Sequence, residues 1–302
     1  MTVAHRLLLV VHPPAGQHDS GHHISSLPQL IEADPDAPQV HVLDVSATRG
    51  DGIFETISIG RGRPQALHAH LQRFARSARM LDLPLGDLSV WHDAVHQLAE
   101  HFVDVDEAWV KTVLTRGIDG HGETAPTGWA YAAVSPDFRR EREVGVDVVL
   151  LDRGYRSDVA ESSPWLLAGA KTLSYATNRA AVREAQRRGA DDVLFVSTDG
   201  MLLEGPTSTL ILRRGDTLVT PPPSFGILEG TTQGDLFTAA EQWGLSTAIS
   251  PLVPDELLAA DAAWLVSSVR HAAIIRSVDG TEIPVDAGLT AAMNGFLRSR
   301  RD

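Results

Sequence analysis

The 302-residue chain contains no cysteine, which excludes disulfides, zinc–thiolate sites and thiol catalysis. It also lacks any apolar run near the roughly 20 residues that a membrane helix requires. We therefore expect no membrane partner and a cytoplasmic location. Positive charge is scarce as well, because 26 lysine and arginine residues stand against 39 aspartate and glutamate residues. The resulting net charge of −13 disfavours nucleic acid as a partner.

The sequence offers little for a metal. His18, His22 and His23 lie beside Asp19, and such side chains can bind a transition metal. His18 and His22 would share a face only on a helix, and the glycines of the same segment disfavour a helix there. The segment therefore reads as a polar loop, and we expect no metal.

Three common catalytic motifs are also missing. The chain has no phosphate-binding Gly-x-x-x-x-Gly-Lys-Ser/Thr loop and no Gly-x-Gly-x-x-Gly dinucleotide fingerprint. It has no Gly-x-Ser-x-Gly nucleophile elbow. Nucleotide-binding and serine hydrolase interpretations therefore have no support.

Apolar periodicity predicts a mixture of helices and strands. The clearest helix runs from Leu67 to Leu81, where apolar residues recur every three or four positions, and Pro84 ends it. Further helices are predicted at 90–102, at 178–188 and from Thr231 or Thr232 onward. Strands are predicted at 7–11, 40–45, 53–59, 108–115, 129–134, 146–151, 193–196, 201–203 and 263–266. The order shows no strict β-α-β alternation, so we expect α+β layers.

Lys171 is the most informative residue for chemistry. It follows the apolar stretch 165–170 and precedes Thr172 and Leu173. An amine in apolar surroundings loses hydration, which favours its neutral, nucleophilic form. A lysine beside an apolar run also snorkels to water, so Lys171 alone leaves both interpretations open.

Two later segments could complement that amine. Glu204 lies at the end of the predicted strand 201–203, where a carboxylate either faces a cleft or stays on a surface turn. Thr231 and Thr232 follow Gly230 at a helix start, where backbone N–H groups and the helix dipole favour a phosphate. A threonine at that position can also simply cap the helix.

Three further residues suit a phosphate. Ser267 and Ser268 follow the buried strand 263–266, where they complete a phosphate cup or bond to the backbone. Arg73 is either a phosphate clamp or a surface cation. An amine, an acid and a phosphate cup are the three groups that pyridoxal phosphate (PLP) requires for its aldehyde, ring nitrogen and phosphate.

The order and spacing of these segments resemble the fold-type IV PLP enzymes, which include branched-chain aminotransferases, D-amino acid aminotransferases and 4-amino-4-deoxychorismate lyases. The similarity extends from Gly50 to Gly280. Five segments carry it: Gly50-Asp-Gly-Ile-Phe-Glu-Thr56, His70-Leu-Gln-Arg73 with Ser77, Lys171-Thr-Leu-Ser-Tyr175, Glu204-Gly-Pro-Thr-Ser208 and Gly226-Ile-Leu-Glu-Gly-Thr-Thr232.

The resemblance implies a role for each candidate residue. Lys171 would form the Schiff base with the cofactor, Tyr175 would lie near its hydroxyl, and Glu204 would pair with its ring nitrogen. The phosphate would be bound by Arg73, Thr231, Thr232, Ser267 and Ser268. The chain departs from the family at Thr209, where asparagine is usual, and at Gln233, where arginine is usual, and its first 45 residues match poorly.

The resemblance also implies an α+β, two-domain fold of the D-amino acid aminotransferase type. We expect a small N-terminal α/β domain at 1–136 and a larger, barrel-like α/β domain that binds PLP at 145–302. The charged run at 137–144 is the expected linker. Family members are homodimers, so the resemblance implies a homodimer.

The reaction expected from the resemblance is that of 4-amino-4-deoxychorismate lyase, which forms 4-aminobenzoate and pyruvate in folate biosynthesis. Ser267-Ser-Val-Arg-His271 is typical of these lyases, whereas branched-chain enzymes favour Gly-Thr-Ala there. D-amino acid or branched-chain aminotransferase activity are the alternatives. A cofactor-binding protein without catalysis is disfavoured by the intact Lys171 and Glu204. Arg116 and Arg270 are candidates for the substrate carboxylate, and a surface role for either is equally open.

Overall fold

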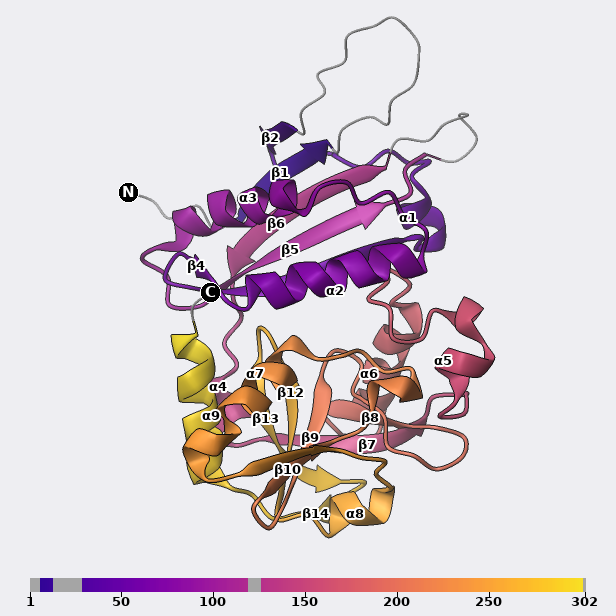
Figure 1. Ribbon diagram of the computed structural model, residues 1–302, viewed down its shortest axis with the longest axis vertical. Helices are drawn as coiled ribbons and strands as arrows, with labels where there is room; N and C mark the ends of the chain where they lie inside the picture. Colours follow the sequence, from indigo (N-terminus) through magenta and orange to yellow (C-terminus); the bar gives the residue numbers. More distant parts are fainter. Residues whose placement is uncertain (1–5, 13–28, 119–125, 301–302) are drawn as a thin grey trace, which may run out of the picture. The chain divides into compact units, whose positions relative to one another are not determined.

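The computed structural model describes residues 6–12, 29–118 and 126–300, drawn in colour in Figure 1. The predicted polar loop with His18, His22 and His23 lies outside these residues. The chain forms two compact units. Unit 1 contains residues 1–135, 170–174 and 301–302, and unit 2 contains residues 136–169 and 175–300.

Unit 1 is built on a six-stranded antiparallel sheet with the strand order β2-β1-β6-β5-β3-β4. Its strands are β1 (Arg6–His12), β2 (Gln29–Ala33), β3 (Gly52–Gly60), β4 (Arg63–Pro64), β5 (Ala108–Thr115) and β6 (Thr127–Val134). Ile53, Ile57 and Ile59 of β3 are buried at alternating positions, as expected for a strand with one face on a core.

The helices of unit 1 are α1 (Val45–Arg49), α2 (Leu67–Met80), α3 (Leu88–Ala99) and the 3₁₀ turn η1 (Glu100–Phe102). Helices α2 and α3 pack on the same sheet (Figure 1). The rings of Phe74 and Trp91 join the two helices edge to face, with centroids 5.0 Å apart. The predicted helix over 67–81 is therefore confirmed.

The predicted strand at 40–45 is wrong. Val42 and Leu43 form a turn, Asp44 makes a single antiparallel bridge with Ile118, and α1 begins at Val45. The Asp44 carboxylate accepts the Ser46 N–H at 2.9 Å, so it caps the helix. Val42 and Leu43 are exposed, which shows that the apolar pattern there reports no core contact.

Unit 2 contains an eight-stranded mixed sheet with the path β11-β10-β9-β12-β13-β7-β8 and with β14 paired to β13. Its strands are β7 (Val146–Asp152), β8 (Asp192–Val196), β9 (Thr209–Arg214), β10 (Thr217–Thr220), β11 (Ser246–Ile249), β12 (Ala262–Ser267), β13 (His271–Val278) and β14 (Thr281–Glu282). The predicted strand at 201–203 is reduced to a single bridge between Leu202 and Val196.

The helices of unit 2 cover both faces of its sheet. They are α4 (Arg139–Glu143), α5 (Val159–Ser162), η2 (Pro164–Leu166), α6 (Ala176–Arg187), η3 (Pro223–Phe225), α7 (Thr231–Ala239), η4 (Ala240–Trp243), α8 (Pro254–Leu258) and α9 (Ala287–Ser299). Neighbouring residues of β12 enter different cores: Leu265 packs in the cluster of Ile275, and Trp264 in that of Met293. The central strands are thus buried on both faces.

Two short segments show how the chain is divided. The charged run expected as a linker at 137–144 contains α4, which belongs to unit 2 and packs against β13 and α9. Residues 170–174 belong to unit 1, although the chain on either side of them belongs to unit 2. Within the described ranges, every helix is too short or too polar to cross a membrane.

Candidate functional site

The segment around Lys171 is hydrogen-bonded to the backbone of β3. Phe54 N–H donates to the Lys171 carbonyl at 3.1 Å, and Leu173 N–H donates to the Gly52 carbonyl at 2.8 Å. Thr172 forms an antiparallel bridge with Ile53. Gly52 has no room for a side chain, because a Cβ there would lie 2.8 Å from the Leu114 carbonyl oxygen and 2.7 Å from Leu173 Cδ1. The glycine of the Gly50-Asp-Gly52 motif therefore permits this pairing.

Helix α2 holds Lys171 from the other side. The Ser77 hydroxyl is buried and accepts the Lys171 N–H at 3.0 Å. The Lys171 backbone is thus fixed at both its N–H and its carbonyl. Its amine lies over the ring of Phe54, with Nζ 4.6 Å from the centroid, a distance suited to a cation–π contact.

Lys111 on β5 shares the same ring. Its Nζ lies 5.4 Å from the Phe54 centroid and 5.8 Å from that of Trp109. Burial lowers the pKa of Lys111, and within the described part of the chain no carboxylate forms an ion pair with it. Lys111 was not predicted from the sequence, although its rarity was a signal: the chain has only two lysines.

Arg73, the predicted phosphate clamp, makes a two-pronged ion pair with Glu55 of β3. Arg73 Nε and Nη2 donate to Glu55 Oε1 and Oε2, each at 2.7 Å. His70 Nδ1 lies 2.7 Å from Oε2. Burial acts to raise the pKa of Glu55, but the Arg73 guanidinium and then His70 outweigh it and hold that pKa far below its usual range. Glu55 and His70 were missed as site residues.

In unit 2, the segment that begins with Tyr175 is hydrogen-bonded to the segment that follows Glu204 through the Pro206 carbonyl. The Tyr175 hydroxyl donates to the Pro206 carbonyl at 3.1 Å, and Asn178 Nδ2 donates to the same oxygen at 2.6 Å. Glu204 is half-buried, and its own carbonyl accepts the Phe195 N–H of β8 at 3.0 Å. The start of α6 and the Glu204 segment therefore support each other.

Three predicted phosphate ligands converge at the start of α7. Thr231 Oγ1 and Thr232 Oγ1 each lie 3.5 Å from Ser268 Oγ. The preceding Gly230 is obligatory, because a Cβ there would lie 2.4 Å from Thr209 Oγ1. First-turn N–H groups lack partners inside a helix, so a helix start with added hydroxyls suits a phosphate. Ser267 ends β12 and lies one residue before this cluster.

The turn that carries Ser268 is held by a buried arginine from α4. Arg142 Nε donates to the Arg270 carbonyl at 2.9 Å, and Nη2 donates to the Val269 carbonyl at 3.1 Å. Arg142 is only 6% exposed. The sequence analysis missed it because it lies in a charged run of the kind that usually faces solvent.

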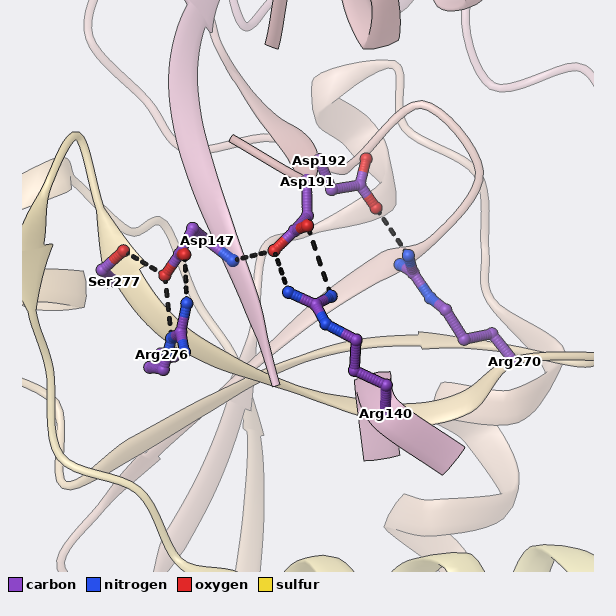
Figure 2. Close-up of polar contacts among 7 residues, drawn as sticks. All are labelled: Arg140, Asp147, Asp191, Asp192, Arg270, Arg276 and Ser277. Carbon is purple, nitrogen blue, oxygen red and sulfur yellow. Dashed lines mark hydrogen bonds and ion pairs between the residues drawn. The ribbon is translucent and has the colours of Figure 1, made fainter. Parts of the chain in front are cut away.

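Both arginines expected to bind a substrate carboxylate already have acceptors within their own unit. Arg270 Nη1 donates to Asp192 at 2.7 Å, beside the Arg140–Asp191 and Arg276–Asp147 pairs (Figure 2). Arg116 donates to Asp51 at 2.7 Å and to the Leu81 carbonyl at 2.6 Å. Their role toward substrate stays a prediction.

His271, which follows the Ser268 turn, has an uncommon backbone conformation and a buried ring. Its φ is +63°, a left-handed conformation uncommon outside glycine. The ring is buried, and its Nδ1 has no hydrogen-bond partner among the described residues. Burial, followed by the nearby Arg142 charge, lowers the pKa of His271 well below its usual value. The histidine is therefore neutral in the folded chain near neutral pH.

Known proteins with similar sequences belong to one family. The model of the family described as amino-transferase class IV matches residues 52–278. A bifunctional aminodeoxychorismate lyase / D-amino acid transaminase of Mycobacterium tuberculosis is 44% identical over 262 residues, which cover 83% of this chain and 89% of the relative.

Solved structures of similar proteins have the same fold. A fold IV-transaminase from Curtobacterium pusillum is 50% identical with a TM-score of 0.90, over 98% of this chain and 99% of that one. A hypothetical aminotransferase from M. tuberculosis in its PLP-bound form is 39% identical with a TM-score of 0.84, over 89% and 95%. The expected fold class is confirmed.

His271 predicts a pH dependence of stability. Its folded pKa is depressed, so below the unfolded value of about 6.5 only the unfolded chain takes up the proton, and stability falls as pH falls. The contribution is fully present above pH 6.5 and declines by up to about 1.4 kcal/mol per pH unit below it. The His271→Asn variant keeps a residue that tolerates positive φ and does not titrate. Thermal melts at pH 7.5 and 5.5 should show a smaller acid-induced loss for the variant, and equal losses would contradict the assignment.

Proposed function

We propose, for a chain that belongs to the class IV aminotransferase family and is a PLP-dependent enzyme, that its reaction is 4-amino-4-deoxychorismate lysis, with D-amino acid transamination as a second activity. The observation that supports this pairing is the likeness to the bifunctional M. tuberculosis protein. Branched-chain transamination is the alternative. The products would be pyruvate and 4-aminobenzoate, which enters folate biosynthesis. The homodimer implied by the resemblance and the cytoplasmic location expected from the composition stay predictions.

The side chains present fit PLP. Unit 1 offers an anchored amine at Lys171 and a guanidinium at Arg73, and unit 2 offers the hydroxyl cluster at the start of α7. We assign the aldehyde to Lys171, the ring nitrogen to Glu204 and the ring hydroxyl to Tyr175. The phosphate is assigned to Arg73, Thr231, Thr232, Ser267 and Ser268. The order of the family's motifs is the basis for assigning residues of both units to one cofactor.

The chemistry asks Lys171 to move a proton. PLP, when bound, supplies an electron sink for the negative charge that develops where the substrate loses its proton. Lys171 Nζ takes that proton and later returns it, as general base and then acid. The Lys171 backbone is held by hydrogen bonds to Phe54 and Ser77. The amine therefore moves by rotation of the side chain. Glu204 would pair with the ring nitrogen and keep it protonated.

The two activities diverge after the proton is removed. Transamination transfers the amino group and needs a keto acid to accept it in the second half of the cycle. Lysis of aminodeoxychorismate needs no acceptor, because pyruvate leaves and the remaining ring becomes aromatic. The requirement for a keto acid therefore separates the reactions, although both begin at Lys171.

Lys111 adds a preference for acidic substrates. A half-buried ammonium without a carboxylate partner among the described residues attracts an anion, and this one lies on the ring that also contacts Lys171. We assign Lys111 to a second carboxylate, such as the distal one of 2-oxoglutarate or one of the two on aminodeoxychorismate. The binding partner of the ammonium would then be the substrate itself.

The two lysines allow a clean test of the attachment site. Wild-type protein with PLP should absorb near the edge of the visible range, and borohydride should fix the cofactor to a peptide that contains Lys171. Lys171→Ala should lose both the band and the adduct in mass spectrometry. Lys111→Ala, the matched control, should keep both. An adduct on Lys111 in the Lys171 variant would refute the assignment.

The reaction is tested with purified protein and two substrate sets. Aminodeoxychorismate without any keto acid should yield 4-aminobenzoate, measured by its fluorescence after separation. D-alanine with 2-oxoglutarate should yield pyruvate. Turnover that depends on a keto acid in every assay would exclude the lyase proposal, and lysis without transamination would exclude the second activity.

Lys111→Met should impair dicarboxylate acceptors selectively. With D-alanine as donor, its KM for 2-oxoglutarate should rise by roughly 10-fold or more, since a charge-assisted hydrogen bond is lost. Its KM for 2-oxobutyrate, which has one carboxylate, should change little. Lys111→Arg, the charge-preserving control, should retain the preference. Equal changes for both acceptors would disprove the role.

A further inference from the structure

We propose that Glu55 is a positioning residue for cofactor binding, which holds Arg73 in the orientation that receives the cofactor phosphate. This inference rests on the proposed function, which assigns Arg73 to that phosphate. We assign Glu55 no direct contact with the cofactor. It acts through Arg73, and its effect should therefore appear in phosphate recognition.

The contact between Glu55 and Arg73 fixes the orientation of the guanidinium plane as well as its distance from the carboxylate. Two parallel N–H···O bonds of 2.7 Å join the planar guanidinium to both carboxylate oxygens. Such a fork leaves the guanidinium no freedom to rotate about its own axis. The Glu55 side chain is fully buried and that of Arg73 is 7% exposed, so water does not compete for either group.

His70 fixes the carboxylate in turn. An ionised carboxylate only accepts hydrogen bonds, so His70 Nδ1 carries the hydrogen in the 2.7 Å contact with Oε2. The His70 side chain has no exposed surface. Glu55 therefore has three donors, two from Arg73 and one from His70, and all of them come from one turn of α2.

The same elements carry the anchors of Lys171. Arg73 and Ser77 are four residues apart on α2, which places them one above the other on one helix face, and Ser77 accepts the Lys171 N–H. Phe54, the residue before Glu55, donates its N–H to the Lys171 carbonyl. Helix α2 and strand β3 therefore both orient the Arg73 guanidinium and fix the backbone of Lys171.

Stability alone does not account for a buried ion pair here. Removing two charges from water is costly, and well-packed apolar residues of similar volume often stabilise a fold as well or better. What an apolar pair cannot provide is a fixed cation. Arg73 is at once charged, oriented and adjacent to the lysine segment, which is what recognition of a dianion requires.

The test compares PLP with pyridoxal, which lacks the phosphate. The full-length apoprotein is titrated with each compound, and the ratio of the two Kd values measures phosphate recognition. Arg73→Gln should lower the preference for PLP by roughly 10-fold or more. Glu55→Gln, which keeps shape but loses charge and one acceptor, should also lower it while affinity for pyridoxal changes little. Asp44→Asn, a fully buried acid in the same unit that caps α1, is the matched control and should keep the preference.

Each outcome has one reading. A lowered preference in the Arg73 variant with an unchanged one in the Glu55 variant would overturn the role of Glu55 and leave the phosphate assignment standing. An unchanged preference in both would remove Arg73 from the phosphate site, and the inference with it. If Glu55→Gln does not fold, Glu55→Asp takes its place: it keeps the charge but withdraws it by one carbon–carbon bond. An undiminished preference in that variant would equally overturn the proposal.

Discussion

The ion pair between Glu55 and Arg73 is the interaction on which the packing around Lys171 in unit 1 depends. A carboxylate without exposed surface needs donors inside the protein, and here they come from α2. That requirement ties α2 to β3 in one register. The same register brings Ser77 to the Lys171 N–H and Phe54 to its carbonyl. The donors that Glu55 requires and the backbone contacts of Lys171 are thus provided by the same packing of α2 on β3.

In unit 2, buried charged side chains also fix the position of a site segment, here the turn that carries Ser268. Arg142 is buried and donates to two carbonyl oxygens of the turn that carries Ser268. Arg270 reaches from that turn to Asp192 at the start of β8. Two cations from distant parts of the chain thus restrain one short turn, and the neutral His271 completes it. The hydroxyl cluster at α7 is accordingly held by contacts outside α7.

The sequence allowed the elements and the motif residues to be predicted, but not their partners. The helix at 67–81 and the start of α7 follow from local periodicity and glycine placement. The sequence did not predict roles for Glu55, Lys111 and Arg142, because those roles depend on contacts between elements far apart in sequence. The charge of Arg142 suggested solvent, and only the fold shows that carbonyl oxygens surround it. The strand expected at 40–45 failed because the Asp44 cap outweighed a weak apolar pattern.

The assignment of Ala170–Ser174 to unit 1 has a consequence for how the protein is made. Domains usually fold in order as they leave the ribosome, but residues 1–135 emerge without the Lys171 segment, which forms a bridge with β3. These contacts of β3 and Ser77 must wait until the polypeptide has grown past Lys171. Unit 1 can therefore finish folding only when much of unit 2 has already been synthesised, so Lys171 joins its unit late in the synthesis of the chain.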